Sequence, residues 1–351
     1  MILRKHLKRC PSSLYRRYHQ PAVKLTVCLL IGCLSLSALS FLAFPPAAQS
    51  QAAPGNQVKR NQLKTFADWC LKKTTLPATA RHTVDVLMKR SRTRDCYQAS
   101  EILSSTATLD LSDTRINDIS PLQVLTELNE LYLGNNQIAD LKPLSSLTKL
   151  TRLYLSYNQI SDLSPLKPLR NLDALYLGNN RISDMSALQS LVNLTSLDLV
   201  SNQIVNLSPL RALSKLSTLD LSFNQITDIS PLQSLISLTE LSMSAQKIAD
   251  LSPLTALEDL TALDLSGNQI TDLSPLKTLQ NLTSLALGGN QIADIRSLST
   301  LPKLTTLYLG GNRIRNLNPL KPLTNLNVLY LQDNPLASLD CPVKPESICR
   351  F

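Results

Sequence analysis

Tyrosine and aspartate recur at one position of a 22-residue spacing, and they are the side chains best suited to contact a partner molecule. Tyrosine gives a large contact area and is enriched in protein interfaces, whereas aspartate would attract a basic partner or a cation. A binding site is predicted from eight residues of this series and Tyr157 beside it: Tyr132, Tyr154, Tyr157, Tyr176, Asp198, Asp220, Asp264, Tyr308 and Tyr330. The alternative is structural, with each side chain packing on its neighbour in a sheet.

The chain offers no recognisable catalytic centre. His82 is the only histidine after residue 48, no serine or cysteine has a nearby base, and no glycine-rich phosphate loop occurs. A further aspartate series, beginning with Asp140, Asp162 and Asp184, provides no clustered oxygen ligands within one unit. These aspartates are predicted to cap a helical turn rather than to bind calcium. We therefore predict a non-enzymatic protein with no cofactor and no metal.

The same spacing runs through residues 105–338 as eleven units without insertion or deletion, with the pattern L-x-x-L-x-L-x-x-N-x-I-x-D-L-S-P-L-x-x-L-x-x. A fixed period of this length with this pattern indicates a leucine-rich-repeat solenoid. An amide side chain can pair the backbone groups of a buried turn, so the asparagine position predicts a structural ladder through the core. Its members are Asn136, Asn158, Asn180, Asn202, Asn224, Asn268, Asn290, Asn312 and Asn334, with Gln246 completing the series.

Each unit predicts one strand and one outer turn. In the unit 150–171, Leu153 and Leu155 alternate with polar residues, as in a short strand with one buried face. Ser164 and Pro165 then predict a helical turn, with the serine as its cap. The predicted fold is an α/β solenoid, a curved right-handed coil with short parallel strands inside and mostly 3₁₀ turns outside.

The repeat N-x-I-x-D-L-S-P-L resembles the repeats of listerial internalins, and it is similar to that of a regulatory subunit of protein phosphatase 1. The C-terminal sequence C-P-V-K-P-E-S-I-C-R-F resembles the end of exported cyanobacterial leucine-rich-repeat proteins. The resemblance implies the fold but leaves the partner open, because a solenoid's partner is set by its exposed residues.

The N-terminus predicts export. Residues 1–48 combine a basic start with an uncharged apolar stretch at residues 25–44 and small residues after it. This pattern is typical of a signal peptide, but the stretch is also long enough for an uncleaved membrane anchor. Either reading places the rest of the chain outside the cytoplasm, secreted, periplasmic or held by one membrane helix. Residues 49–57 are predicted to be a linker.

Two caps are predicted to close the repeats, a helical cap at residues 58–104 and a short C-terminal cap at 339–351. Helical spacing predicts the apolar faces of two cap helices, the second opened by Pro77: Leu63, Phe66, Ala67, Cys70, Leu71, Ala80, Val84, Leu87 and Met88. Trp69 is predicted to lie in the cap core. Cys70, Cys96, Cys341 and Cys349 flank the repeats in pairs and predict two disulfides, with four reduced, buried thiols as the alternative.

Charge does not favour nucleic acid as a partner. The pI near 9.2 reflects the first 100 residues, with 17 Lys or Arg against 3 Asp, whereas the later residues carry 18 basic against 23 acidic side chains. The function that these features favour is an exported or membrane-anchored scaffold that binds a protein ligand on its concave face. Two alternatives remain: a module that binds cell-envelope glycan, and an intracellular phosphatase-regulatory subunit.

Overall fold

The computed structural model describes residues 63–351. The predicted leader, including the apolar stretch at 25–44, and the predicted linker at 49–57 lie outside the described residues. Within residues 63–351, no helix has both the length and the apolar character needed to span a bilayer.

Three α-helices precede the repeats: α2 (Phe66–Leu71), α3 (Ala78–Ser91) and α4 (Cys96–Ser104), with a 3₁₀ turn η5 (Lys73–Thr75) after the first. A capping box starts α2, in which the Thr65 side chain accepts from the Asp68 backbone N–H and the Asp68 carboxylate accepts from the Thr65 backbone N–H. The predicted helical cap is confirmed. Helix α4 was not predicted from the sequence.

The cap has its own small core and covers the first coil of the repeats. Trp69 is buried as predicted, and Leu87 is buried from α3. The prediction for Leu71 was wrong, because this residue ends α2 and its side chain is 56% exposed. The buried Thr83 hydroxyl donates to the Asp118 carbonyl oxygen of the first coil at 2.6 Å. The helices therefore cover the N-terminal end of the leucine core.

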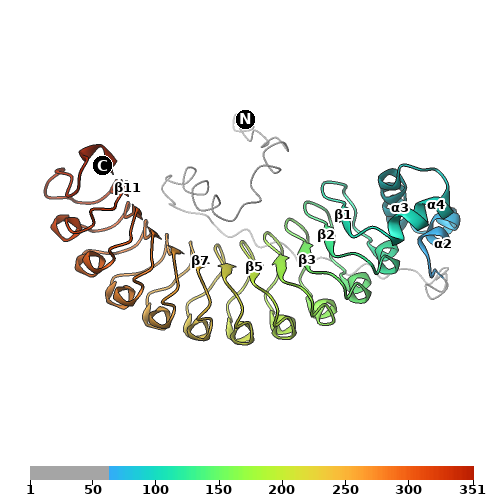
Figure 1. The fold of residues 1–351 in the computed structure, drawn as a ribbon, viewed down its shortest axis with the longest axis horizontal. Helices are drawn as coiled ribbons and strands as arrows, with labels where there is room; N and C mark the ends of the chain where they lie inside the picture. Colours follow the sequence, from blue (N-terminus) through green and yellow to red (C-terminus); the bar gives the residue numbers. More distant parts are fainter. Residues whose placement is uncertain (1–62) are drawn as a thin grey trace, which may run out of the picture. The chain divides into compact units, whose positions relative to one another are not determined.

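One parallel sheet of twelve strands in chain order runs through the repeats (Figure 1). The strands are β1 (Thr108–Asp110), β2 (Glu130–Tyr132), β3 (Arg152–Tyr154), β4 (Ala174–Tyr176), β5 (Ser196–Asp198), β6 (Thr218–Asp220), β7 (Glu240–Ser242), β8 (Ala262–Asp264), β9 (Ser284–Ala286), β10 (Thr306–Tyr308), β11 (Val328–Tyr330) and β12 (Cys349–Arg350). Strand β12, which the sequence did not predict, comes from the C-terminal cap and pairs with β11.

The outer side of each coil is a 3₁₀ turn. These turns are η6 (Ser120–Val124), η7 (Lys142–Ser146), η8 (Ser164–Leu166), η9 (Ser186–Ser190), η10 (Ser208–Ala212), η11 (Ser230–Ser234), η12 (Ser252–Ala256), η13 (Ser274–Thr278), η14 (Arg296–Thr300), η15 (Asn318–Leu320) and, in the C-terminal cap, η16 (Glu346–Ile348). In Figure 1 the strands of residues 105–338 line the inner side of an arc and the turns line its outer side, as predicted.

Of the two caps predicted for the outer turn, the serine was wrong and the aspartate is confirmed. Ser164 is the first residue of η8 and makes no capping bond of its own. Instead the Asp162 carboxylate accepts from the Ser164 backbone N–H at 2.8 Å and from its hydroxyl at 2.9 Å. A carboxylate two residues before the turn reaches the first free N–H, as in an Asx turn. The aspartate that recurs in successive repeats therefore caps the outer turns.

Leucine and isoleucine form one continuous core. In the unit 150–171 all seven apolar side chains are at most 2% exposed: Leu150, Leu153, Leu155, Ile160, Leu163, Leu166 and Leu169. A single coil cannot enclose so many apolar groups, so each coil depends on its neighbours for burial. The two ends of this core are where the caps are needed.

Both predicted disulfides are present. Cys70–Cys96 joins α2 to the start of α4, and Cys341–Cys349 closes the C-terminal cap. Each bond lies at one end of the leucine core, where apolar side chains and a sheet edge would otherwise meet water.

Replacing Cys341 and Cys349 with serine is expected to open the C-terminal cap locally. The disulfide closes a loop with a sequence separation of 8. By the chain-entropy relation, removing it lowers the free energy of unfolding of the cap by about 2.5 kcal/mol. The Leu331 amide, which donates to the Arg350 carbonyl at 2.7 Å, should then exchange roughly 50- to 100-fold faster. Amide hydrogen exchange measures this, with the Leu221 amide as the internal control. Unchanged protection at Leu331 would show that β12 is held by packing alone.

Candidate functional site

The parallel register brings the predicted binding residues other than Tyr157 into one row on the concave face. Tyr132, Tyr154 and Tyr176 are direct Cα partners on neighbouring strands, and Tyr176 is followed by Asp198 and then Asp220. We call this row, with its small-residue interruptions, the concave column; its members are Asp110, Tyr132, Tyr154, Tyr176, Asp198, Asp220, Ser242, Asp264, Ala286, Tyr308 and Tyr330. The column separates into a tyrosine triplet, an acidic segment and a tyrosine pair.

The tyrosines stack on one another. The ring centroids of Tyr132 and Tyr154 lie 4.3 Å apart with an interplanar angle of 8°, and those of Tyr154 and Tyr176 lie 4.5 Å apart at 4°. Tyr308 and Tyr330 form a second stack at 4.9 Å and 15°. Because Tyr154 has a ring against each of its faces, a ligand reaches this residue at the ring edge and the hydroxyl group.

The hydroxyls of Tyr132, Tyr154 and Tyr308 stay protonated over a wide pH range. Burial, followed by the neighbouring Tyr176 and Tyr132, raises the pKa of Tyr154, and burial is also the main cause of the raised pKa of Tyr132 and Tyr308. Each neutral hydroxyl can both donate and accept a hydrogen bond. The Tyr132 hydroxyl donates to a Glu130 carboxylate oxygen at 3.2 Å.

A cation from the chain itself accompanies the tyrosine triplet. Arg152 pairs with Glu130 at 3.0 Å and lies 3.8 Å from the Asp173 carboxylate. These two carboxylates, the first of them beside Tyr132, thus have a basic neighbour within the protein.

The acidic segment consists of Asp198, Asp220 and Asp264, and the carboxyl groups of Asp220 and Asp264 have raised pKa values. Burial, followed by the charge of Asp198, raises the pKa of Asp220 to about 6, and burial raises the pKa of Asp264. Each carboxylate accepts one backbone N–H two residues on, from Val200, Ser222 and Ser266 in turn, at 2.9–3.0 Å. Among residues 63–351, no ion pair involves Asp220 or Asp264.

Two exposed aromatic side chains lie beside the concave column. Tyr157, which was predicted, is 53% exposed with φ of 60°, and Phe223, which was not, is 56% exposed with φ of 58°. A left-handed backbone is unfavourable for a bulky residue, and three later repeats place glycine at the same position: Gly267, Gly289 and Gly311. The signal that could have identified Phe223 is an aromatic residue directly before the ladder asparagine.

The asparagine side chains bridge successive coils. The Asn180 Nδ2 donates to the Leu177 and Leu155 carbonyls, and its Oδ1 accepts from the Ile160 N–H. The same pattern is present at the other asparagines of the series: Asn136, Asn158, Asn202, Asn224, Asn268, Asn290, Asn312 and Asn334. Gln246 reaches the preceding coil, but its bond within its own coil is a long one to Ser244. These residues are buried or half-buried, and their side-chain hydrogen bonds support the fold.

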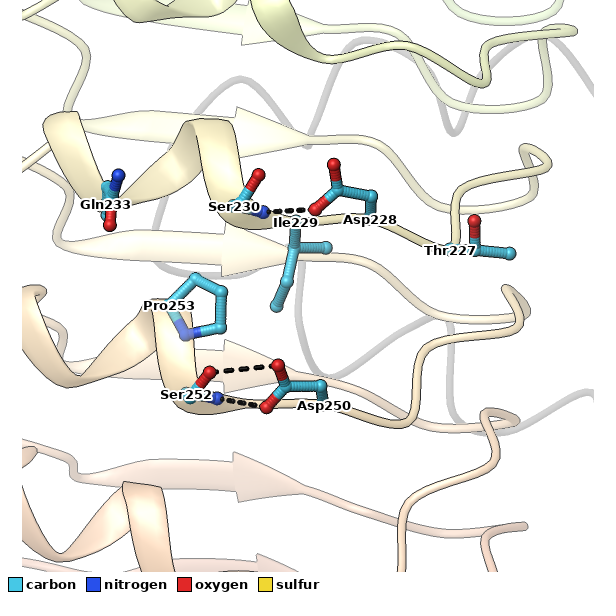
Figure 2. A pocket seen from close by; sticks show the side chains of 8 residues that line it. All are labelled: Thr227, Asp228, Ile229, Ser230, Gln233, Asp250, Ser252 and Pro253. Atoms are coloured by element: carbon cyan, nitrogen blue, oxygen red, sulfur yellow. Dashed lines mark hydrogen bonds between the residues drawn. The ribbon is translucent and has the colours of Figure 1, made fainter.

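The hollows between the outer turns are weaker candidates for a binding site than the concave column. Figure 2 shows the one lined by Asp228, Ser230, Asp250 and Ser252 among others. Both carboxylates there accept hydrogen bonds from the serine of their own coil. An equivalent hollow lies between Asp162 and Asp184, so the feature follows from the repeat itself. No group of three or more potential metal ligands occurs among the described residues.

Comparison with known proteins gives a consistent family and fold. The family model described as leucine rich repeats, in two copies, matches ten overlapping stretches from residues 107–146 to 302–341. An internalin (inlF) from Listeria monocytogenes is 32% identical, with 75% of this chain and 94% of that chain covered and a TM-score of 0.53. A second internalin (inlC2) from the same species is 37% identical, with 58% and 91% covered and a TM-score of 0.55.

More distant similarity concerns the fold alone. The ectodomain of the Arabidopsis thaliana receptor kinase GASSHO1/SCHENGEN3, solved in complex with CASPARIAN STRIP INTEGRITY FACTOR 2, is 22% identical, with 68% of this chain and 37% of that chain covered and a TM-score of 0.53. No curated protein sequence matches the chain significantly.

Proposed function

Because the chain belongs to the leucine-rich-repeat family and carries internalin-like repeats, we propose that it is an exported scaffold that binds a protein ligand on its concave face. The observation that carries this proposal is the tyrosine triplet, which presents ring edges and hydroxyl groups in one continuous strip. Strips of this kind combine apolar contact with hydrogen bonding, as interface residues must.

The fold provides general support. The similar plant receptor kinase ectodomain was solved with a bound partner, so a solenoid of this fold can hold another molecule. In our protein the concave column lies on the exposed side of the strands and carries five of the chain's nine tyrosines, with Tyr157 as a sixth beside it. No comparable concentration of aromatic side chains is present on the outer turns among the described residues.

Export is supported by the N-terminal residue pattern and by the disulfides. Residues 1–48 fit a signal peptide, or a membrane anchor through residues 25–44 if uncleaved. Disulfides form in oxidising compartments and are rare in the cytosol, which disfavours the intracellular phosphatase-regulatory alternative. Either way the binding face would act outside the cytoplasm.

The carbohydrate alternative is less well supported. Sugar rings bind aromatic side chains face to face, and Tyr154 has both faces covered by other tyrosines. A protein that offers apolar groups and hydrogen-bond partners suits the exposed edges and hydroxyls better.

Replacing Tyr132, Tyr154 and Tyr176 with alanine is expected to weaken ligand capture by roughly 100-fold or more, because such aromatic residues carry much of an interface's energy. The full-length chain is immobilised, and proteins retained from an extract of extracytoplasmic material are quantified by mass spectrometry. Loss of the stacks costs about 1–3 kcal/mol of stability, so the variant should remain folded.

The control is Tyr97→Ala, which removes an exposed tyrosine of the helical cap. It should retain the same proteins as the native chain. Equal capture by the triple variant would refute a binding role for the triplet. Retention that survives protease treatment of the bound material would instead identify glycan as the ligand.

A further inference from the structure

We propose that the partner of the concave face is a basic polypeptide segment, which places Lys or Arg side chains over the acidic segment and apolar side chains against the two tyrosine stacks. This inference rests on the proposed function and adds the chemistry of the ligand. The structural argument concerns Asp220 and Asp264, which lie between Tyr176 and Tyr308 in the concave column.

The charge distribution distinguishes the acidic segment from the rest of the concave face. Near the tyrosine triplet the chain supplies Arg152 to Glu130 and Asp173. No corresponding ion pair reaches Asp220 or Asp264 from the described residues. The positions next to these aspartates hold Thr218, Ser222 and other uncharged residues, or the acidic Asp198 and Glu240. A cationic side chain is therefore the complementary group that the sheet face lacks.

Partial burial of Asp220 and Asp264 strengthens their attraction to a ligand cation. Asp220 and Asp264 are partly buried in the row, where a carboxylate loses hydration without gaining a full positive charge in return. Their pKa values are raised for this reason. A guanidinium or ammonium group placed over them would stabilise the ionised forms, and it would interact more strongly there than at an exposed site.

The dimensions of the column suit an extended segment that crosses the strands. Tyr176 and Tyr308 are six strand spacings apart, or about 29 Å at ~4.8 Å per strand. An extended chain of about nine residues covers that distance at ~3.3 Å per residue. Such a segment would contact a tyrosine stack near each end and the aspartates in its middle. Phe223, held exposed at a left-handed backbone position, would flank the middle of the segment.

The test uses a phage-displayed random dodecapeptide library, selected on the immobilised full-length protein at pH 7.5, followed by synthetic peptides of the selected sequences. Two variants are compared, Asp220→Asn/Asp264→Asn and Asp228→Asn/Asp250→Asn. Both remove two negative charges and keep a side-chain oxygen for the local backbone N–H. The chain itself shows that asparagine serves on the outer turns, since Asn206 accepts from the Ser208 N–H at 2.9 Å.

The expected result is selection of peptides enriched in Lys or Arg at central positions. Their affinity should fall at least 10-fold in the concave variant and stay unchanged in the outer-turn variant. Replacing the selected arginines with citrulline should cause a similar loss, and added salt should weaken binding to the native protein.

Selection of neutral or acidic peptides would overturn the inference, as would equal losses in both variants or a failure to select any peptide. The proposed function is judged separately. If the tyrosine triplet variant loses the captured protein while the Asp220→Asn/Asp264→Asn variant keeps it, the concave face binds a protein but does not select a basic one.

Discussion

Replacing Asn268 with alanine is expected to lower the free energy of unfolding by about 3–5 kcal/mol, because it leaves two buried backbone groups without a partner. The Asn268 Oδ1 accepts from the Ile248 N–H at 3.0 Å, and its Nδ2 donates to the Met243 and Leu265 carbonyls at 2.9 Å each. The Leu265 carbonyl keeps a second donor from the next coil, but the Met243 carbonyl does not, because Gln246 bonds elsewhere.

Asn290→Ala is the matched control. This position is equally buried, but removing its side chain leaves only the Ile270 N–H unpaired, since the Leu265 and Leu287 carbonyls each keep a donor from an adjacent asparagine. We expect a loss of about 2–3 kcal/mol there, smaller than at Asn268. Urea unfolding followed by circular dichroism measures both. Equal losses at the two positions would show that the unpaired Met243 carbonyl carries no cost.

Asp220→Asn is expected to stabilise the protein at neutral pH and to remove part of its pH dependence. The pKa of Asp220 is raised from 3.8 to about 6, mainly by burial and then by Asp198. Between these values the folded chain keeps a proton that the unfolded chain loses. The associated stability is therefore complete below about pH 4 and is lost as the pH rises through 6, which amounts to about 3 kcal/mol for a shift of this size.

The measurement is urea unfolding of the native protein and the variant from pH 4 to pH 8. The variant should gain up to about 3 kcal/mol over the native protein at pH 7.5, with little difference at pH 4. Asp228→Asn is the control, because the pKa of that aspartate is lowered by its bonds with Ser230, so asparagine there should give no such gain. A stability difference between native and Asp220→Asn that does not vary with pH would contradict the expectation.

Asn268 and Asp220 are both polar side chains with little exposure, but they have opposite effects on the stability of the solenoid. Asn268 has hydrogen-bond partners on both sides, so it stabilises the fold. Asp220 is desolvated without a cation from the described residues, so its ionised form costs stability in the free protein. A ligand that supplies the cation would recover that free energy, which is consistent with a binding role for the concave face.

The environments of the side chains on the concave face could not be predicted from the sequence and became clear only from the tertiary structure. The sequence placed the tyrosines in one row, but only the structure showed that their rings stack, which directs ligands to edges and hydroxyls. The raised pKa of Asp220 depends on burial by neighbouring coils, and the exposure of Phe223 depends on its backbone angle. None of these is a property of one repeat.

The repeat period by itself determined the solenoid, its inner strands and outer 3₁₀ turns, because each coil contacts mainly its neighbours and the same short pattern sets every contact. The cysteines likewise indicated both disulfides from their positions at the two ends. The tertiary structure alone decided that strand β12 extends the sheet, which of the two predicted caps, Asp162 or Ser164, binds the first free N–H of the turn, and that Leu71 faces solvent. These outcomes depend on where the chain departs from the period or on which of two adjacent polar groups reaches an N–H first, and a pattern of residue types does not specify such distances.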